Sequence, residues 1–201
     1  MGLNNQTELS KIYLLQKQVR IPLFQNKTTA LDELINGCIK EDRRAQKLLF
    51  DRFAPVMMGV CKRYVRQTEV AEEMLSNGFI KAFRYISQFE NKGSFEGWLR
   101  TIMVRECLDY LRTEKKLILA LDATDTTPEP VAFAEVNLEI EDLIKLINSL
   151  PTGYREVFNL YAIEGYKHNE IAELLGISES TSKTQLMKAR ISLQKLISSI
   201  K

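Results

Sequence analysis

The sequence predicts an all-α protein of two small helical domains joined by an acidic linker. Apolar residues recur at helical spacing over long stretches, and the alternating pattern of strands is almost absent. A chain of 201 residues is long enough for two domains that each bury a modest core. A change of composition between Leu117 and Ile144, which contains no Lys or Arg, separates the two helical stretches.

Composition and motif content limit the classes of function that the chain can have. The net charge is only +2, so a nucleic-acid surface must come from local clustering of basic residues. No stretch approaches about 20 apolar residues, and no cleavable leader is apparent, which predicts a cytoplasmic protein. The sequence has no phosphate-binding GxxxxGK[ST] loop, no HExxH and no nucleophile elbow, so we expect a binding protein that is not an enzyme.

Cysteine and histidine usage argues against a metal site. Cys38, Cys61 and Cys107 are odd in number and never spaced as CxxC, which predicts buried thiols in a reducing compartment. His168 is the only histidine and has no partners at metal-ligand spacing. We therefore expect no metal and no cofactor, and a surface or helix-capping role for His168.

The first helical domain is expected at residues 31–117, after an unassigned extension at 1–30. Its pattern is interrupted at Pro55, which suits a helix start, at a polar turn near Gln67–Thr68, and at the Asn91–Ser94 turn. Ser94 is a candidate N-cap for a helix that runs to about Lys115.

The linker is expected at residues 118–137. Its segment 124–130 (TDTTPEP) is unsuited to a helix, and the stretch that contains it is acidic. A solvated connector is the simplest interpretation of this segment. The acidic residues of the stretch are Asp122, Asp125, Glu129, Glu135, Glu139, Glu141 and Asp142.

The second domain, at 138–201, ends in a helix-turn-helix pattern. Helices resume at about Glu139, a Leu150–Pro151 junction starts the next helix, and Gly165 ends it. The segment 167–190 (KHNEIAELLGISESTSKTQLMKAR) then predicts two helices joined at a Gly-Ile turn, with Ser178 as N-cap of the second. A hairpin packed only for structure is the alternative. Apolar spacing leaves an outward face suited to DNA contact: Ser180, Lys183, Thr184, Met187 and Lys188.

Two features of the first domain suggest further binding surfaces. A polar stripe on one helix, either solvated or a docking face for a protein, comprises Glu73, Ser76, Asn77, Lys81 and Arg84. Aromatic residues then surround a polar turn at 88–94 and basic residues follow along the next helix, as single-stranded nucleic acid requires. Aromatic residues at helical spacing are more often core, so we expect Phe83 and Trp98 to be mainly core.

These pieces together resemble the extracytoplasmic-function subgroup of bacterial RNA polymerase sigma factors. The matching strings are AEEMLSNGFIKAFRYISQF, GSFEGWLRTIMVRECLDYLR, LPTGYREVFNLYAIEGY and EIAELLGISESTSKTQLMKAR. In that family a region-2 domain docks on the β′ clamp helices of core RNA polymerase and opens the −10 promoter element. A region-4 domain, near the β flap, recognises the −35 element as duplex DNA.

The resemblance implies roles for individual residues. The polar stripe would contact core polymerase, and the 88–94 turn would receive a base flipped from the single strand. The implied −10 contacts are Phe89, Asn91, Lys92, Ser94, Arg100, Arg105 and Arg112. The implied −35 contacts are Ser180, Thr181, Lys183, Thr184, Gln185, Met187 and Lys188. The acidic linker would thread the RNA-exit path, and an anti-sigma factor is a partner that the resemblance allows.

Departures from the family pattern keep two other functions open. The docking helix has Glu73, Ser76 and Asn77 where the family commonly has Asp, Gln and Glu, and Gln185 and Arg105 also differ from the usual residues. One alternative is a stand-alone helix-turn-helix regulator. The other is a sigma-like interaction module that binds polymerase without starting transcription.

Overall fold

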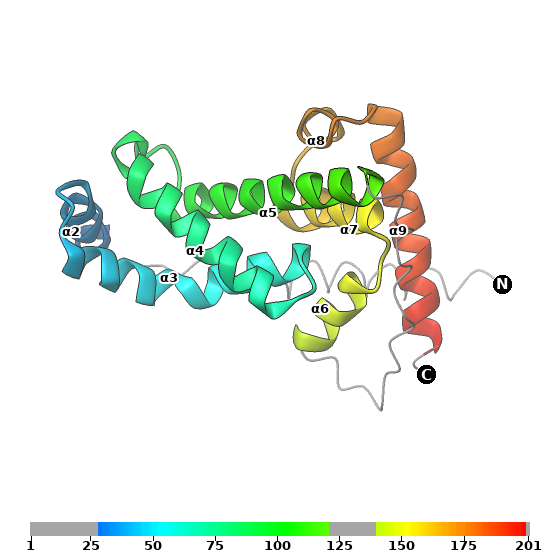
Figure 1. Cartoon of the computed structure of the whole chain (residues 1–201), viewed down its shortest axis with the longest axis horizontal. Helices are drawn as coiled ribbons and strands as arrows, with labels where there is room; N and C mark the ends of the chain where they lie inside the picture. The colour runs from blue at the N-terminus through cyan, green and yellow to red at the C-terminus, as the bar shows by residue number, and fades with distance from the viewer. Residues whose placement is uncertain (1–27, 121–139, 200–201) are drawn as a thin grey trace. The chain divides into compact units, whose positions relative to one another are not determined.

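The computed structural model describes residues 28–120 and 140–199 (Figure 1). Every element in these two ranges is a helix or a turn, which confirms the predicted all-α class for the described part of the chain. The ranges belong to two compact units, and each is described here by itself. Most of the expected acidic linker, and all but the last three residues of the expected 1–30 extension, lie outside the described residues.

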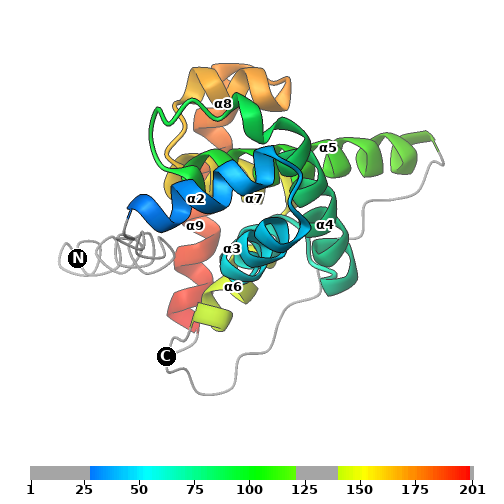
Figure 2. The same ribbon diagram turned by 90° about the vertical axis from the view of Figure 1, so that its left-hand side faces the viewer.

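The first unit is built from four α-helices and a short 3-10 turn. They are α2 (Thr28–Ile39), α3 (Arg43–Tyr64), α4 (Thr68–Tyr85), η1 (Ile86–Gln88) and α5 (Phe95–Ala120). Helices α3, α4 and α5 pack against one another, and α2 packs on α3. Figure 2 looks almost along α3 and shows α2 and α4 beside it. Leu49 and Met57 of α3, Ala71 of α4 and Met103 of α5 are fully buried in the core of this unit.

Local sequence explains most of these boundaries. The Asp42 carboxylate accepts the backbone N–H of Arg44 at 2.8 Å and so caps the start of α3. The Ser94 hydroxyl accepts the N–H of Gly97 at 3.1 Å, which confirms it as the N-cap of α5. Asn91 and Gly93 have φ angles of 55° and 101°, the left-handed values that a tight polar turn requires. The predicted turns at 67–68 and 91–94 are confirmed.

The expected helix start at Pro55 is wrong. Pro55 lies inside α3, which continues through it without ending. A proline in a helix interior removes one backbone hydrogen bond and usually kinks or breaks the helix. Here Phe53 and Met57, on either side of Pro55, are buried in the core, and tertiary packing of this kind outweighs local propensity.

The second unit contains four α-helices and a π-helical segment. They are α6 (Ile140–Asn148), α7 (Thr152–Phe158), η2 (Asn159–Glu164), α8 (His168–Leu175) and α9 (Glu179–Ser199). Helix α9 packs against α6, α7 and α8. Gly165 and Gly176 end η2 and α8 in the left-handed conformation, with φ of 83° and 65°. The predicted helix-turn-helix is confirmed, whereas the π-helical geometry of η2 was not predicted.

The three cysteines are all buried and free, as expected from their spacing. Burial and the nearby Asp42 carboxylate raise the pKa of the Cys38 thiol to about 11. A hydrogen bond with Cys61 and burial raise the pKa of Cys107. The Cys38 and Cys107 thiols therefore remain protonated in the folded protein at neutral pH. Among the helices that the structure describes, none is long and apolar enough to cross a membrane.

Candidate functional site

The outward face of α9 is the clearest candidate site in the second unit. A single buried row runs along this helix through Ser182, Leu186, Ala189, Leu193 and Ile197. The side chains that the sequence predicted to face outward are all exposed: Ser180, Lys183, Thr184, Met187 and Lys188. Thr181, implied as a −35 contact by the resemblance, is exposed as well. Met187 is 54% exposed, so this face presents one apolar side chain among polar ones. An exposed apolar side chain can contact the methyl group of thymine.

The N-terminus of α9 is well defined. The Ser178 hydroxyl accepts the backbone N–H of Thr181 at 3.0 Å, which confirms Ser178 as the N-cap. Lys183 lies 2.6 Å from Glu179 in an exposed ion pair, and this hydrogen bond lowers the pKa of the Glu179 carboxyl. The positive end of the helix and the exposed lysines together favour an anionic backbone such as that of DNA.

Gln185 corrects the predicted set of DNA-facing residues. It is only half-exposed, and its amide lies so near Gly153 of α7 that a Cβ there would be 3.2 Å from Nε2. Its Oε1 atom is buried. The reason is geometric: position 185 lies beside the buried Leu186 on the α7 side of the helix. In this structure Gln185 therefore faces its own domain.

His168 occupies a joint between three helical segments, a place that the sequence did not indicate. Its Nδ1 atom and the Ser182 hydroxyl are 2.9 Å apart, and its ring stacks on Tyr161 at 4.5 Å. The guanidinium of Arg190 lies 5.8 Å from the centre of the Tyr161 ring. Burial and the neighbouring Lys183 lower the pKa of His168, with Arg190 adding to the effect and Glu179 opposing it. His168 was expected to be a surface or capping residue. It is indeed the first residue of α8, but it is half-buried among side chains of η2 and α9.

The predicted polar stripe on α4 is present but is not wholly polar. Glu73, Ser76, Lys81 and Arg84 are exposed and Asn77 is half-buried. Lys81 also pairs with Glu106 of α5 at 2.5 Å, so it ties the two helices together. Ile80 is 56% exposed and shares the helical spacing of Glu73, Asn77 and Arg84. Sequence reasoning passed over Ile80 because an apolar residue among core positions gives no signal of exposure.

Phe89 also departs from its predicted role. Its ring packs on Phe95 at 5.3 Å and on Trp98 at 5.7 Å, and Phe95 in turn contacts Phe53. Phe89 is half-buried in this aromatic cluster, so part of its ring surface is taken up by contacts within its own domain. Phe83 and Trp98, expected mainly in the core, are half-buried as well. The turn that follows offers other groups.

The turn at 91–94 is exposed throughout. Asn91, Lys92, Gly93 and Ser94 all face solvent, and Lys92 forms an exposed ion pair with Glu90 at 2.6 Å. The Ser94 hydroxyl already caps α5, which limits its freedom to contact a ligand. Asn91 and Lys92 are therefore the side chains of this turn best placed to meet a base or a phosphate.

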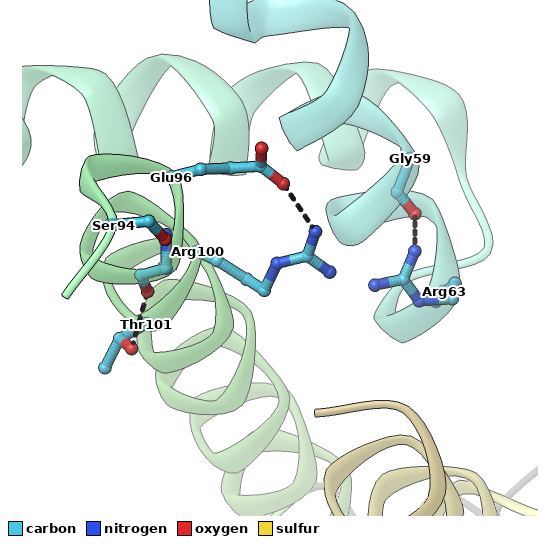
Figure 3. A network of polar contacts seen from close by, with 7 residues as sticks. Gly59, Arg63, Ser94, Glu96, Arg100 and Thr101 are labelled. Atoms are coloured by element: carbon cyan, nitrogen blue, oxygen red, sulfur yellow. Dashed lines mark hydrogen bonds and ion pairs between the residues drawn. The ribbon is translucent and has the colours of Figure 1, made fainter. Parts of the chain in front are cut away.

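Arg100 is the main correction among the basic residues of α5. Its guanidinium donates to Glu96 at 2.9 Å, and the two side chains are only 17% and 8% exposed (Figure 3). Arg63, in the same view, is buried in α3 and donates to the Gly59 carbonyl at 3.0 Å. Arg100 therefore belongs to the interior network of the unit, because α5 is packed by both α3 and α4.

Arg105 and Arg112 remain on the outer side of α5. Both are exposed, and Arg112 forms a 3.0 Å ion pair with Asp109 in which both side chains are more than half exposed. Their spacing of seven residues places them on one helix face. The exposed turn therefore lies just before α5, and the exposed Arg105 and Arg112 lie further along that helix. Arg100 does not belong to this group of exposed side chains.

Comparison with known proteins places these surfaces in a family context. The family models "Sigma-70 region 2" and "Sigma-70, region 4" match residues 49–117 and 140–193. The chain is 27% identical over 173 residues to the ECF RNA polymerase sigma-E factor of Haemophilus influenzae, covering 78% of this chain and 89% of that protein. It is 28% identical over 165 residues to the ECF RNA polymerase sigma factor SigM of Mycobacterium tuberculosis, covering 82% and 83%.

A solved structure has the same fold. It is the sigma factor RpoE in complex with the anti-sigma factor NepR from Bartonella quintana, with a TM-score of 0.52 and 23% identity. The match covers 76% of this chain and 96% of that one. The two family models fall on the two helical units, in the order that the sequence predicted.

Proposed function

The chain belongs to the extracytoplasmic-function sigma factors of the sigma-70 family, and from this premise we propose a division of roles between its two helical units. It is a sigma factor that binds core RNA polymerase and directs promoter-specific initiation of transcription. Sigma factors are initiation factors without enzymatic activity, and we assign none to this chain. We call residues 31–117 the region-2 domain and residues 138–201 the region-4 domain.

The region-4 domain recognises the −35 element as duplex DNA through the outward face of α9. The observation that supports this most is the capped N-terminus followed by exposed Lys183, Thr184, Met187 and Lys188 above one narrow buried row. A helix of this design enters the major groove by its N-terminal end. Thr184 and Met187 are assigned to base edges, and Lys183 and Lys188 to base edges or phosphates.

The region-2 domain docks on the β′ clamp helices of core polymerase through α4. Glu73, Arg84 and the half-buried Asn77 surround the exposed Ile80, which gives this face the apolar centre and polar rim of a protein interface. An Ile80→Ser protein should bind core polymerase more weakly, because it loses the apolar centre of the proposed interface. The fold should be kept, because the Ile80 side chain is exposed. Leu48→Ser on α3, where Leu48 is 48% exposed, is the matched control and should bind normally.

The 91–94 turn and the outer face of α5 act on the −10 element. Asn91 and Lys92 are assigned to a base extruded from the non-template strand, and Arg105 and Arg112 to its backbone. Basic residues beside an exposed polar turn favour a single strand over a duplex at this position. The cost of unstacking one base, a few kcal/mol, would be met by these contacts and by docking of the polymerase.

The acidic linker is assigned to the positively charged RNA-exit path of the polymerase. Its carboxylates, among them Asp122, Asp125 and Glu129, would imitate nucleic-acid charge there. Neutralising these three residues should alter initiation or promoter escape and leave binding to core polymerase nearly unchanged. Equal transcription at every step would make the segment a simple connector. The protein acts in the cytoplasm, and an anti-sigma factor is a further proposed partner.

Reconstitution with purified core polymerase and a randomised promoter library tests the whole assignment. The expected result is transcription from a defined subset of promoters that share both a −10 and a −35 sequence. Binding to core polymerase without initiation from any promoter would identify an interaction module. Promoter binding without polymerase would instead identify a stand-alone regulator.

A further inference from the structure

A cluster of polar and aromatic side chains links η2, α8 and α9, and neither the fold nor the comparisons assign it a role. Tyr161 comes from η2, His168 from the start of α8, and Ser182 and Arg190 from α9. His168 shares a 2.9 Å hydrogen bond with Ser182, and its ring stacks on Tyr161 at 4.5 Å. The Arg190 guanidinium lies over the Tyr161 ring. Four side chains from three segments therefore meet at one point.

Ser182 is the polar member of the buried row of α9. It is fully buried, whereas its neighbours Thr181 and Lys183 are exposed. A hydroxyl at this depth requires a hydrogen-bond partner, and His168 supplies one from the preceding helix. Since the bond fixes Ser182 inward, it also fixes the rotation of α9 about its axis, and with it the direction of Lys183 and Thr184.

We propose that His168 is a positioning residue for promoter specificity, which holds the recognition helix α9 at the angle and rotation needed to recognise the −35 element. The inference rests on the proposed recognition of that element by α9. His168 does not itself contact a base in this account. It acts through Ser182, which is buried in α9, and through its stacking contact with the exposed Tyr161 ring of η2.

The charges around His168 make the joint sensitive to protonation. Lys183 and Arg190 on α9 are cationic neighbours, Glu179 on α9 is an anionic one, and the Tyr161 ring of η2 stacks on the imidazole. Within its own turn, the Glu170 carboxylate accepts the Lys167 backbone N–H at 2.6 Å. Burial and the two cations outweigh Glu179, so the folded state favours the neutral imidazole.

The sign of the pH dependence follows directly. Because the pKa of His168 is lowered from its ordinary 6.5 in the folded protein, the joint is fully stabilising above that pH. The stabilisation is lost as the pH falls below 6.5 toward the folded pKa. Recognition of the −35 element should weaken over the same range. A histidine that contacts phosphate would behave in the opposite way, since protonation would strengthen binding.

The test uses full-length protein in holoenzyme with core polymerase. The probe is a promoter selected by wild-type holoenzyme, together with the same promoter carrying a scrambled −35 sequence. The measured quantity is the ratio of open-complex formation on the two promoters, from about pH 5.5 to about pH 8. Effects of pH on the polymerase and on the −10 element cancel in this ratio.

The wild-type ratio should fall below pH 6.5. His168→Ala should lower the ratio roughly five- to tenfold at neutral pH and remove its pH dependence, because it loses a hydrogen bond and a ring contact. His168→Asn can keep a hydrogen bond to Ser182 without titrating, so its ratio should stay closer to wild type and be flat with pH. Ser182→Ala should lower the ratio but keep the pH dependence of the remaining histidine.

Two results would overturn the proposal. One is a ratio for His168→Asn and Ser182→Ala that matches wild type at every pH. The other is a wild-type ratio that rises as the pH falls, which would make His168 a phosphate contact. Thr184→Ala separates this proposal from the assignment on which it rests, because Thr184 is exposed and assigned to a base edge. If that variant leaves the ratio unchanged, recognition of the −35 element by α9 is itself wrong.

Discussion

Helices α5 and α9 both carry basic side chains expected to meet DNA, but they bury their residues differently. In α9 a single row is buried, from Ser182 to Ile197. In α5 two adjacent rows are buried, and they include the polar Glu96 beside Phe95, Leu99, Met103, Val104, Cys107, Leu108 and Leu111. A basic residue at the edge of a wide buried face can be drawn into the interior, as Arg100 is. The width of the buried face therefore decides which cations remain available to a ligand.

The largest expected effect tests this difference within α5. Arg100→Met would leave the Glu96 carboxylate buried without its partner and should lower the free energy of unfolding by about 2–3 kcal/mol. Arg112→Met removes an ion pair whose side chains are both more than half exposed. It should change the free energy of unfolding by less than about 0.5 kcal/mol. Urea unfolding of the two proteins makes the comparison. Equal stability would mean that Arg100 is a surface residue in solution.

A second expected effect belongs to α9. Lys188→Ala should weaken binding to the −35 element across all sequences and reduce the slope of log affinity against log salt by about 0.9, provided that its contact is to phosphate. Stability should hardly change, because Lys188 is exposed. Holoenzyme binding to promoter DNA at several salt concentrations provides the slope. A loss confined to one base position, with the slope intact, would move Lys188 to a base edge.

A smaller effect is expected at the turn before α5. Asn91 has a left-handed backbone with φ of 55°, so Asn91→Ala should cost about 1 kcal/mol, whereas Asn91→Gly should not destabilise the protein through strain. Both variants remove the amide that is assigned to the −10 strand. Thermal unfolding and permanganate footprinting of the open complex separate the two contributions. Normal promoter opening by Asn91→Gly would remove Asn91 from the site.

The smallest effect concerns Gln185. An arginine at position 185 that faced the major groove would shift preference toward guanine at one position, since Gln pairs with adenine and Arg with guanine. Because the Gln185 amide lies against Gly153, we now expect Gln185→Arg to leave base preference nearly unchanged. Promoter-library transcription by the two holoenzymes measures this. A clear shift toward guanine would show that the side chain turns outward when DNA binds.

The sequence predicted the helices, the two glycine-ended turns and the Ser94 and Ser178 caps because each depends on short-range spacing. It also predicted the exposed face of α9, since one buried row is easily recognised in a helical pattern. It failed where long-range packing decides the outcome. Pro55 remains in α3 because its neighbours are buried, and Phe89 joins an aromatic cluster that draws on α3 and α5. The Glu96–Arg100 pair and the His168–Ser182 bond are likewise tertiary features.

The most direct test of the two roles is to map which DNA each unit touches in the open complex. The three native cysteines are buried, so a cysteine introduced by Lys92→Cys or Thr184→Cys is the one that reacts with a tethered iron chelate. Cleavage of the promoter DNA in the holoenzyme complex is then read on both strands. We predict cuts from position 184 within duplex −35 DNA, and cuts from position 92 within the single-stranded −10 region. Cuts from both positions at the same element, or no cuts from position 184, would contradict the account.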